Sequence, residues 1–255
     1  MNIRIKFQRY GTMKFIGHLD MMRYFQKAIR RADIDIAYSG GYSPHPIMSF
    51  AAPLGVGITS DGEYFDIAAN STRSSQDSIE ALNHTMAEGI SVLEYKKLPD
   101  TAKPAMSLVA AADYLVYGKM GNELFENIQS FCEGQEQILI TKQTKKQELQ
   151  MDLKPLIYEM KAVKLGDKDV LRKLHVKSPE ILDESSDELL NGLFLKVCTG
   201  SRDNVKPELV LEALCRFCGI PFHSLMFKVH RLEVYAKAAD GSGFLTLGEL
   251  GEDIK

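Results

Sequence analysis

I-R-I-K-F-Q, residues 3–8, alternates apolar and polar side chains from beginning to end. Side chains of a β-strand point alternately to its two faces, so this stretch predicts a strand with one buried face. From about His18 to Asp33 the apolar residues instead recur every three or four positions, which predicts an amphipathic helix. The residues on its apolar face are Met21, Met22, Phe25, Ala28, Ile29 and Ala32. The chain is therefore expected to open with a strand and a helix that pack together.

The residues that follow continue this order. Residues 47–58 and 62–70 are interpreted as two strands joined by a turn at Thr59–Gly62, because Asp-Gly favours tight hairpin turns. A second amphipathic helix is expected over 74–88 and a strand over 90–95. The order βαββαβ is that of a ferredoxin-like domain with an antiparallel sheet.

A second βαββαβ domain is predicted after the proline-bracketed segment 98–104. The fold class is therefore α+β, with ferredoxin-like domains at 1–97 and 106–237. The second domain carries a long insertion at about 143–191, with a short helix expected over 152–160, and a glycine-rich, flexible tail over 238–255. The strands expected in the second domain are 113–117, 137–141, 193–199 and 227–235, and the helices are 122–131 and 207–217.

The composition is that of an ordinary globular protein, with 45% hydrophobic and 25% charged residues among 255. We expect a cytoplasmic protein, because the N-terminal residues lack the apolar core of a signal peptide and no stretch reaches 18 apolar residues. The four cysteines have no disulfide-framework spacing and are expected to be thiols.

The charge is distributed unevenly along the chain. Residues 1–60 hold eight basic and three acidic residues, a net charge of +5, whereas the whole chain carries −3. A basic face is predicted on the first helix, opposite its apolar face, and consists of Arg23, Lys27, Arg30 and Arg31. Further basic residues precede it, at Arg4, Lys6, Arg9 and Lys14. The face is interpreted either as a nucleic-acid-binding surface or as an ordinary solvated face.

The loop Y-S-G-G-Y-S-P-H-P, residues 38–46, combines a glycine pair with two prolines. Such a loop holds its side chains rigidly, so Tyr38, Tyr42 and His45 are candidates for stacking on nucleic-acid bases. The alternative is a stiff connection between the first helix and the sheet. Tyr42 and His45 therefore join the basic face as candidate nucleic-acid-binding residues.

Three titratable residues near these elements are candidates for acid–base catalysis. His18 and Asp20 begin the first helix, and the loop is expected to bring His45 near them. Helix capping and loop stabilisation are the alternative roles. No metal or cofactor is expected, because Cys215 and Cys218 with His223 and His230 match no standard zinc spacing.

Several motifs together resemble the radical SAM-linked protein family, a bacterial domain family of unknown function. In the first seventy residues the motifs are G-H-L-D at 17–20, R-x-x-x-K-A-I-R-R-A at 23–32, Y-S-G-G-Y-S-P-H-P at 38–46, S-F-A-A-P-L-G-V-G at 49–57 and E-Y-F-D-I at 63–67. Those of the later half are M-D-L-K-P-L-I at 151–157, N-V-K-P-E-L-V-L-E-A-L at 204–214 and V-H-R-L-E-V-Y at 229–235. The resemblance spans nearly the whole chain.

The resemblance implies a partner rather than a reaction. Members of that family are encoded beside, or fused to, B12-binding radical SAM proteins, often near ribosomal-protein and ribonuclease genes. This chain lacks the C-x₃-C-x₂-C triplet that holds a radical SAM iron–sulfur cluster. We therefore expect a non-catalytic partner of a radical SAM enzyme that binds or presents RNA in RNA or ribosome modification. The alternative is an RNA-processing or RNA-modifying enzyme that uses His18, His45 and Asp20.

Overall fold

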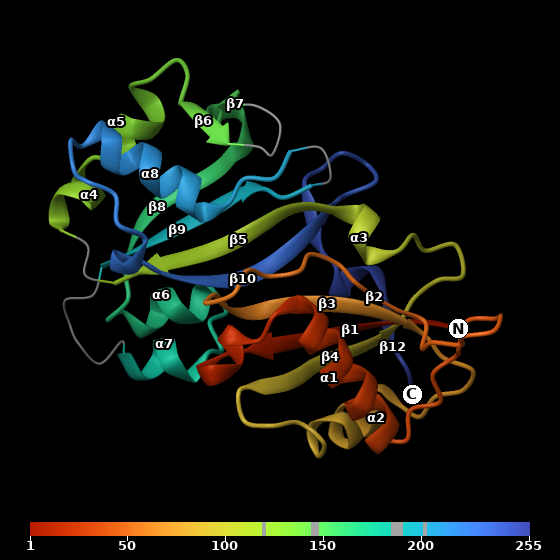
Figure 1. Cartoon of the computed structure of the whole chain (residues 1–255). Helices are drawn as coiled ribbons and strands as arrows, with labels where there is room; N and C mark the ends of the chain where they lie inside the picture. Colours follow the sequence, from red (N-terminus) through yellow and green to blue (C-terminus); the bar gives the residue numbers. More distant parts are fainter. Residues whose placement is uncertain (119–120, 144–147, 185–190, 201–202) are drawn as a thin grey trace. The chain divides into compact units, whose positions relative to one another are not determined.

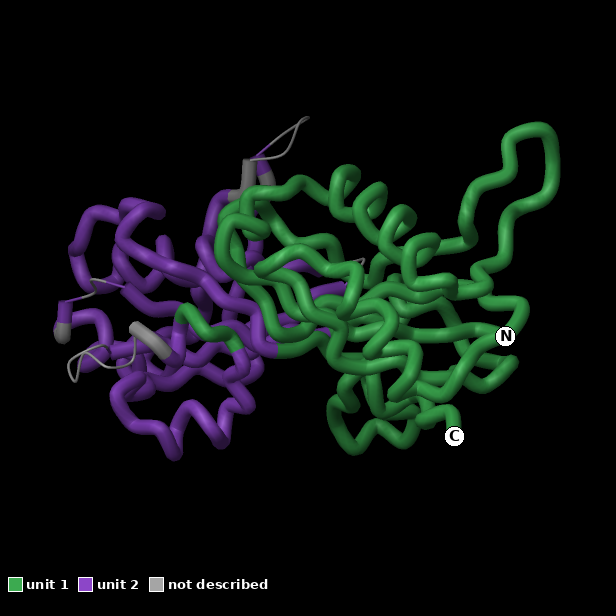
Figure 2. Tube along the Cα trace, turned by 90° about the horizontal axis from the view of Figure 1, so that it is seen from below, with its two compact units in different colours: residues 1–110, 178–180, 233–255 green, residues 111–177, 181–232 purple. Residues whose placement is uncertain are grey.

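The computed structural model describes residues 1–118, 121–143, 148–184, 191–200 and 203–255 and has an α+β fold (Figure 1). The chain divides into two compact units, which Figure 2 colours separately. Unit 1 comprises residues 1–110, 178–180 and 233–255, and unit 2 comprises residues 111–177 and 181–232. Unit 1 therefore holds both ends of the chain and the residues singled out by the sequence as a candidate site.

The strand predicted at residues 3–8 lies in the middle of the sheet of unit 1. This strand, β1, pairs antiparallel with β3 on one side and β4 on the other. β2 pairs with β3, and β12 pairs with β4, so the order is β12-β4-β1-β3-β2. The bounds are β1 Asn2–Arg9, β2 Met48–Phe50, β3 Thr59–Ala68, β4 Ile90–Lys97 and β12 Glu252–Asp253.

Two amphipathic helices, α1 and α2, pack on one face of this sheet and contact each other (Figure 1). α1 begins after the extended Gly17 and ends where Asp33 adopts a positive φ of 55°. α2 begins at a Ser74 cap, whose hydroxyl accepts the backbone N–H of Asp77. The helical segments of unit 1 are η1 Gly11–Phe15, α1 His18–Arg31, α2 Ser75–Asn83, α3 Ala105–Leu108 and η4 Gly248–Leu250.

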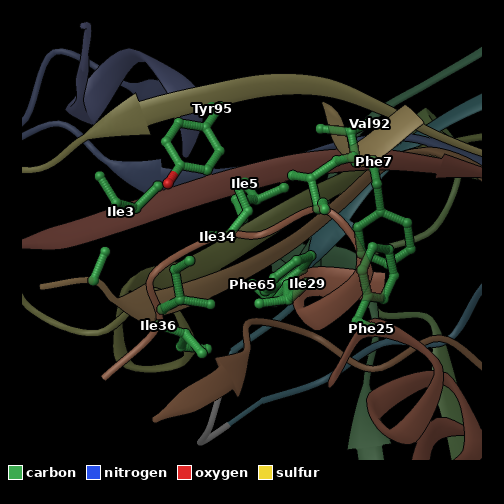
Figure 3. Packing of buried hydrophobic residues seen from close by; sticks show 14 of the residues in the cluster. Ile3, Ile5, Phe7, Phe25, Ile29, Ile34, Ile36, Phe65, Val92 and Tyr95 are labelled. Carbon is green, nitrogen blue, oxygen red and sulfur yellow. The ribbon is translucent and has the colours of Figure 1, made fainter. Parts of the chain in front are cut away.

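The core between α1 and the sheet contains a group of contacting aromatic rings among aliphatic side chains (Figure 3). The ring centroids of Phe25 and Phe7 lie 4.6 Å apart, and those of Phe25 and Phe65 lie 4.7 Å apart. Phe50 stacks on Phe65 at 5.1 Å. The predicted buried face of β1 is confirmed, because Ile3, Ile5 and Phe7 are all fully buried in this core. The opposite face, expected to be exposed, is buried as well, at Arg4, Lys6 and Gln8.

The turn expected at Thr59–Gly62 is wrong, because these residues form the first part of β3. The connection between β2 and β3 lies earlier, in residues 51–58, and the two strands do pair antiparallel, with Met48 opposite Ile67. Asp61 is buried, and its carboxylate accepts the backbone N–H of Ser178 at 3.2 Å. This hydrogen bond to a residue more than a hundred positions away favours the strand over the turn that Asp61-Gly62 would form locally.

Residues 238–255, expected to be a flexible tail, carry β11 (Phe244–Thr246), η4 and β12. Leu247 is fully buried and its carbonyl accepts an N–H from Arg4 at 3.1 Å. The backbone N–H of Ile254 donates to the Ser75 hydroxyl at 2.8 Å. The structure differs from the expectation because these long-range hydrogen bonds order a segment whose composition is rich in glycine.

The outer edge of β4 is capped by side chains of α2. The Asn83 amide donates to the carbonyl of Val92 at 3.0 Å, and its oxygen accepts the N–H of Val92 at 2.7 Å. The Ser75 hydroxyl donates to the carbonyl of Tyr95. The Asn83 side chain therefore bonds the backbone N–H and carbonyl of Val92 as a neighbouring strand would. It thus covers part of a strand edge that could otherwise pair with another chain.

Asn83→Ala should lower the free energy of unfolding by about 1 kcal/mol, because it removes two hydrogen bonds from Val92 at a partly exposed site. It should also promote self-association through the uncovered edge. Urea denaturation and size-exclusion chromatography measure the two effects. The control is Gln76→Ala on the same helix, which removes only an exposed side-chain bond to Glu80 and should change stability by less than about 0.5 kcal/mol. Equal behaviour of the two variants would contradict the capping role.

Unit 2 contains a sheet in the order β5-β9-β8 and a separate hairpin of β6 and β7, all paired antiparallel. Its core includes Leu115, Leu171 and Phe194. The strands that lie wholly or partly in unit 2 are β5 Val109–Tyr117, β6 Leu139–Gln143, β7 Glu148–Asp152, β8 Ile157–Lys164, β9 Asn191–Cys198 and β10 Lys228–Lys237. The helical segments that do so are α4 Asn122–Glu126, α5 Ile128–Glu133, η2 Lys154–Leu156, α6 Lys168–Lys173, α7 Pro179–Glu184, α8 Pro207–Phe217 and η3 Ser224–Met226.

One of the two strands that pair with β9, β8, lies within the expected insertion at about 143–191. The sequence assigns the segment 137–141 to the main sheet, whereas β6 pairs with β7 in the hairpin. The helix expected over 152–160 is wrong, since η2 and β8 occupy those residues. A register shift between Ile157 and Glu159 interrupts the alternation of β8, so its sequence does not show the period of two.

Candidate functional site

The outward face of α1 carries the basic residues predicted from the sequence. Arg23, Lys27, Arg30 and Arg31 are all exposed, while Met21, Phe25, Ala28 and Ile29 are buried on the opposite face. Arg23 pairs with Asp20 at 3.3 Å and Arg31 donates to the carbonyl of Thr85 at 3.1 Å. Among the described residues, Lys27 and Arg30 have no hydrogen-bond or ion-pair partner. Lys27 and Arg30 are therefore available to a ligand without the loss of an existing contact.

The other basic residues of the first fifteen do not extend this face. Arg4 is 1% exposed and forms a two-bond ion pair with Asp66, at 2.8 and 3.0 Å. Arg9 is also buried, and its guanidinium donates to the carbonyls of Ile16 and Gly55. Lys14 pairs with Glu180 at 3.3 Å. The basic residues that precede α1 thus serve mainly to stabilise unit 1.

Lys6 is buried in a charged cluster on the face of the sheet opposite the aromatic core. Its ammonium pairs with Glu233 at 2.5 Å and lies 3.6 Å from Glu94. The Tyr64 hydroxyl donates to Glu233 at 2.8 Å. Burial, and then the negative charges of Glu233 and Glu94, raise the pKa of Tyr64 well above its usual value. Tyr64 therefore remains a neutral hydrogen-bond donor.

The loop 38–46 is closed at its base and open at its tip. A β-bridge joins Tyr38 to Pro46, and the Ser39 hydroxyl contacts both the ring nitrogen Nδ1 and the backbone N–H of His45. Gly41 has a φ of 100°, which explains a glycine at the turn. The Tyr42 side chain is fully exposed. The loop thus holds Tyr42 in solvent on a base fixed by hydrogen bonds.

The three candidate catalytic residues each contact a different neighbour. The His18 ring meets Phe50 edge-on at 5.2 Å, Asp20 pairs with Arg23, and His45 contacts Ser39. In the described part of the chain, no hydrogen bond or ion pair joins any two of the three. His18 and Asp20 share the first turn of α1, whereas His45 lies in the loop 38–46.

The four cysteines are free thiols, and no disulfide joins any two of them. They are Cys132, Cys198, Cys215 and Cys218. Burial raises the pKa of the Cys215 and Cys218 thiols, with Cys218 and Glu123 respectively adding to the effect. Within the described ranges, no group of three or more His, Cys, Asp or Glu side chains is placed to hold a metal ion.

A pocket beside Asp66 is a feature that sequence reasoning missed. It has a volume of about 190 Å³, and its lining includes the polar residues Asn2, Ser49, Asp66 and Lys103. Its apolar walls include Ile47 and Leu98. The lining comes from the N-terminus, β2, β3 and the segment 98–104, all within unit 1, so no local motif could reveal it.

Comparison with known proteins places the chain in a family. In the described part of the chain, no helix is long and apolar enough to cross a membrane. No curated protein matches the sequence. A family model described as "Uncharacterized protein conserved in bacteria (DUF2344)" matches residues 2–207, which include β1, α1, the loop 38–46 and all of the pocket lining. The chain therefore belongs to this family of uncharacterised proteins conserved in bacteria, DUF2344.

Proposed function

We propose that this chain is a non-catalytic RNA-binding protein that presents RNA to a partner enzyme. The outward face of α1 carries the proposal, because four exposed cations lie opposite the buried residues Met21, Phe25, Ala28 and Ile29. Lysine and arginine on such a face bind phosphates by displacing condensed counterions. The exposed Tyr42 on its fixed loop adds a ring on which an unpaired base can stack.

We also infer that each unit is a variant of the ferredoxin-like fold. The order β4-β1-β3-β2 in unit 1, with α1 and α2 on one face, supports this inference for the N-terminal part. The order β5-β9-β8 supports it for unit 2, with β8 in the role expected for residues 137–141. Sheets of this kind bind single-stranded RNA in many proteins, which is an argument from fold analogy.

The partner that we propose is a radical SAM enzyme of the bacterial cytoplasm. The motifs around residues 17–20, 38–46 and 49–57 motivate this choice, since they resemble the radical SAM-linked family. The chain itself lacks the three-cysteine motif that holds the catalytic cluster, so the radical chemistry belongs to the partner. Four free cysteines suit a reducing compartment.

Reversing Arg23, Lys27 and Arg30 to Glu should weaken RNA binding and reduce its dependence on salt. Each phosphate contact with a single strand contributes roughly 0.7 to the slope of log affinity against log salt, so three lost contacts flatten it by about 2. Fluorescence anisotropy of a labelled single-stranded RNA over a NaCl series measures the slope. Thermal melts check folding, which should change little because all three side chains are exposed.

The structure supplies a closely matched control on α6. Lys168, Arg172 and Lys173 are also exposed, and Arg172 pairs with Asp169 at i, i+3 just as Arg23 pairs with Asp20. Reversing these three residues changes the net charge equally and should leave the salt slope close to that of the wild type. Equal salt slopes of RNA affinity for both triple variants would show that the α1 face is an ordinary solvated surface and not an RNA-binding one. Shortening of the RNA during the assay would instead support the catalytic alternative with His18, Asp20 and His45.

A further inference from the structure

The pocket beside Asp66 has the size of a single aromatic ring system. A cavity of about 150 Å³ is large enough to bind benzene, so about 190 Å³ admits a ring of nucleobase size. Ile47, Leu98 and Pro104 supply apolar walls for the faces of such a ring. Met48 and Ser49 belong to β2, which follows directly on the exposed loop 38–46.

Asp66 keeps one hydrogen-bonding position open. A carboxylate has about four acceptor sites. Three are used in the structure: Oδ1 accepts Arg4 Nε at 2.8 Å, and Oδ2 accepts Arg4 Nη2 at 3.0 Å and the Ala105 N–H at 2.7 Å. The residue is 9% exposed and lines the pocket, and its remaining acceptor site belongs to Oδ1. A ligand that fits this position offers a neutral N–H or amino donor, because Arg4 already balances the carboxylate charge.

The rest of the pocket lining suits the other parts of a nucleotide. The Asn2 amide and the Ser49 hydroxyl both donate and accept hydrogen bonds, as the edge of a base requires. Lys103 is an exposed residue of the same pocket lining, and its ammonium group favours the binding of a phosphate there. A second hollow, at Lys97–Asp100 and Glu249–Glu252, is larger, at about 360 Å³, but includes Asp100, Glu249 and Glu252, which repel phosphate.

We propose that this pocket binds one unpaired base of the RNA, and that the base carries an exocyclic amino group that donates to Asp66. This inference rests on the proposed RNA binding and adds a specific site for one base to the contacts of the α1 face with phosphates. The Arg4–Asp66 ion pair orients the carboxylate, and the pocket walls hold the ring. The site discriminates between bases, whereas the cations of α1 do not.

The first test compares two nucleotides that differ only in the amino group. AMP, CMP and GMP are titrated against the full chain by NMR, and each is paired with its analogue that lacks the exocyclic amino group, which for AMP is purine riboside monophosphate. We expect at least one of the three to bind at the pocket residues, and loss of the amino group to weaken binding by roughly tenfold, since a site built for a donor rejects an analogue without one. Absence of binding by all three nucleotides, or equal binding without the amino group, would overturn the proposal.

Two variants separate the pocket from the rest of the RNA site. Ser49→Leu fills the pocket and should abolish nucleotide binding. Lys103→Ala should weaken the binding of monophosphates more than that of nucleosides, and it leaves the hydrogen bond from Arg4 to the carbonyl of residue 103 intact. Ser91→Leu, on β4 and with the same intermediate burial as Ser49, is the control for folding. If RNA binding depends on α1 but is unchanged in Ser49→Leu, the proposed base binding in the pocket is wrong, whereas the proposed RNA-binding function still holds. Binding of nucleotides but of no RNA would overturn both.

Discussion

Asp66→Ala lowers the free energy of unfolding by about 3–5 kcal/mol, the usual cost of breaking a buried ion pair by removing one partner. Arg4 is 1% exposed, and its guanidinium loses both bonds to the carboxylate. The Ala105 N–H loses its acceptor at the same time. The bonds from Arg4 to the carbonyls of Leu247 and Lys103 remain, but they do not balance its charge. Urea denaturation followed by circular dichroism measures the change.

The exposed ion pair between Lys96 and Asp253 is the control for this prediction. Their side chains are 22% and 67% exposed, and Asp253→Ala should cost less than about 1 kcal/mol because solvent screens the pair. The double variant Arg4→Met with Asp66→Leu should recover much of the stability lost in Asp66→Ala, since it leaves no buried charge without a partner. If Asp66→Ala cost no more than Asp253→Ala, the buried ion pair between Arg4 on β1 and Asp66 on β3 would not stabilise unit 1.

Phe25→Ala should lower the free energy of unfolding by about 3–5 kcal/mol, as expected when a large aromatic side chain leaves a packed core. Phe25 is fully buried on α1 and contacts the rings of Phe7 and Phe65 at 4.6 and 4.7 Å (Figure 3). The variant removes these ring contacts and leaves a cavity between α1 and the sheet. Chemical denaturation measures the loss, and the midpoint should fall without a change in the spectrum of the folded state.

The matched control lies ten residues earlier. Phe15 ends η1 and is 63% exposed, so Phe15→Ala should change stability by less than about 0.5 kcal/mol. Phe25→Leu keeps the site apolar and should cost less than Phe25→Ala, because a smaller cavity remains. Similar losses for Phe15→Ala and Phe25→Ala would show that the aromatic cluster is not the core that holds α1 to the sheet.

The sequence alone determined the elements whose periodicity is local and uninterrupted. The alternation of residues 3–8 predicted β1, and the spacing of Met21, Phe25 and Ile29 predicted both α1 and its buried face. It also predicted that the basic residues of α1 face solvent. These predictions hold because a strand or helix with one apolar face must bury that face whatever its neighbours are.

Only the tertiary structure decided where the charges and the remaining strands lie. Arg4 and Lys6 have the polar signature of an exposed face, yet they are buried because Asp66 and Glu233 reach them from distant parts of the chain. The ordered residues 244–254 and the pairing of β8 with β9 likewise depend on long-range hydrogen bonds. The pocket at Asp66 follows the same rule, since residues 2, 49, 66 and 103 meet only after folding. Local periodicity records which face of an element is apolar, but not which segment will cover its polar face.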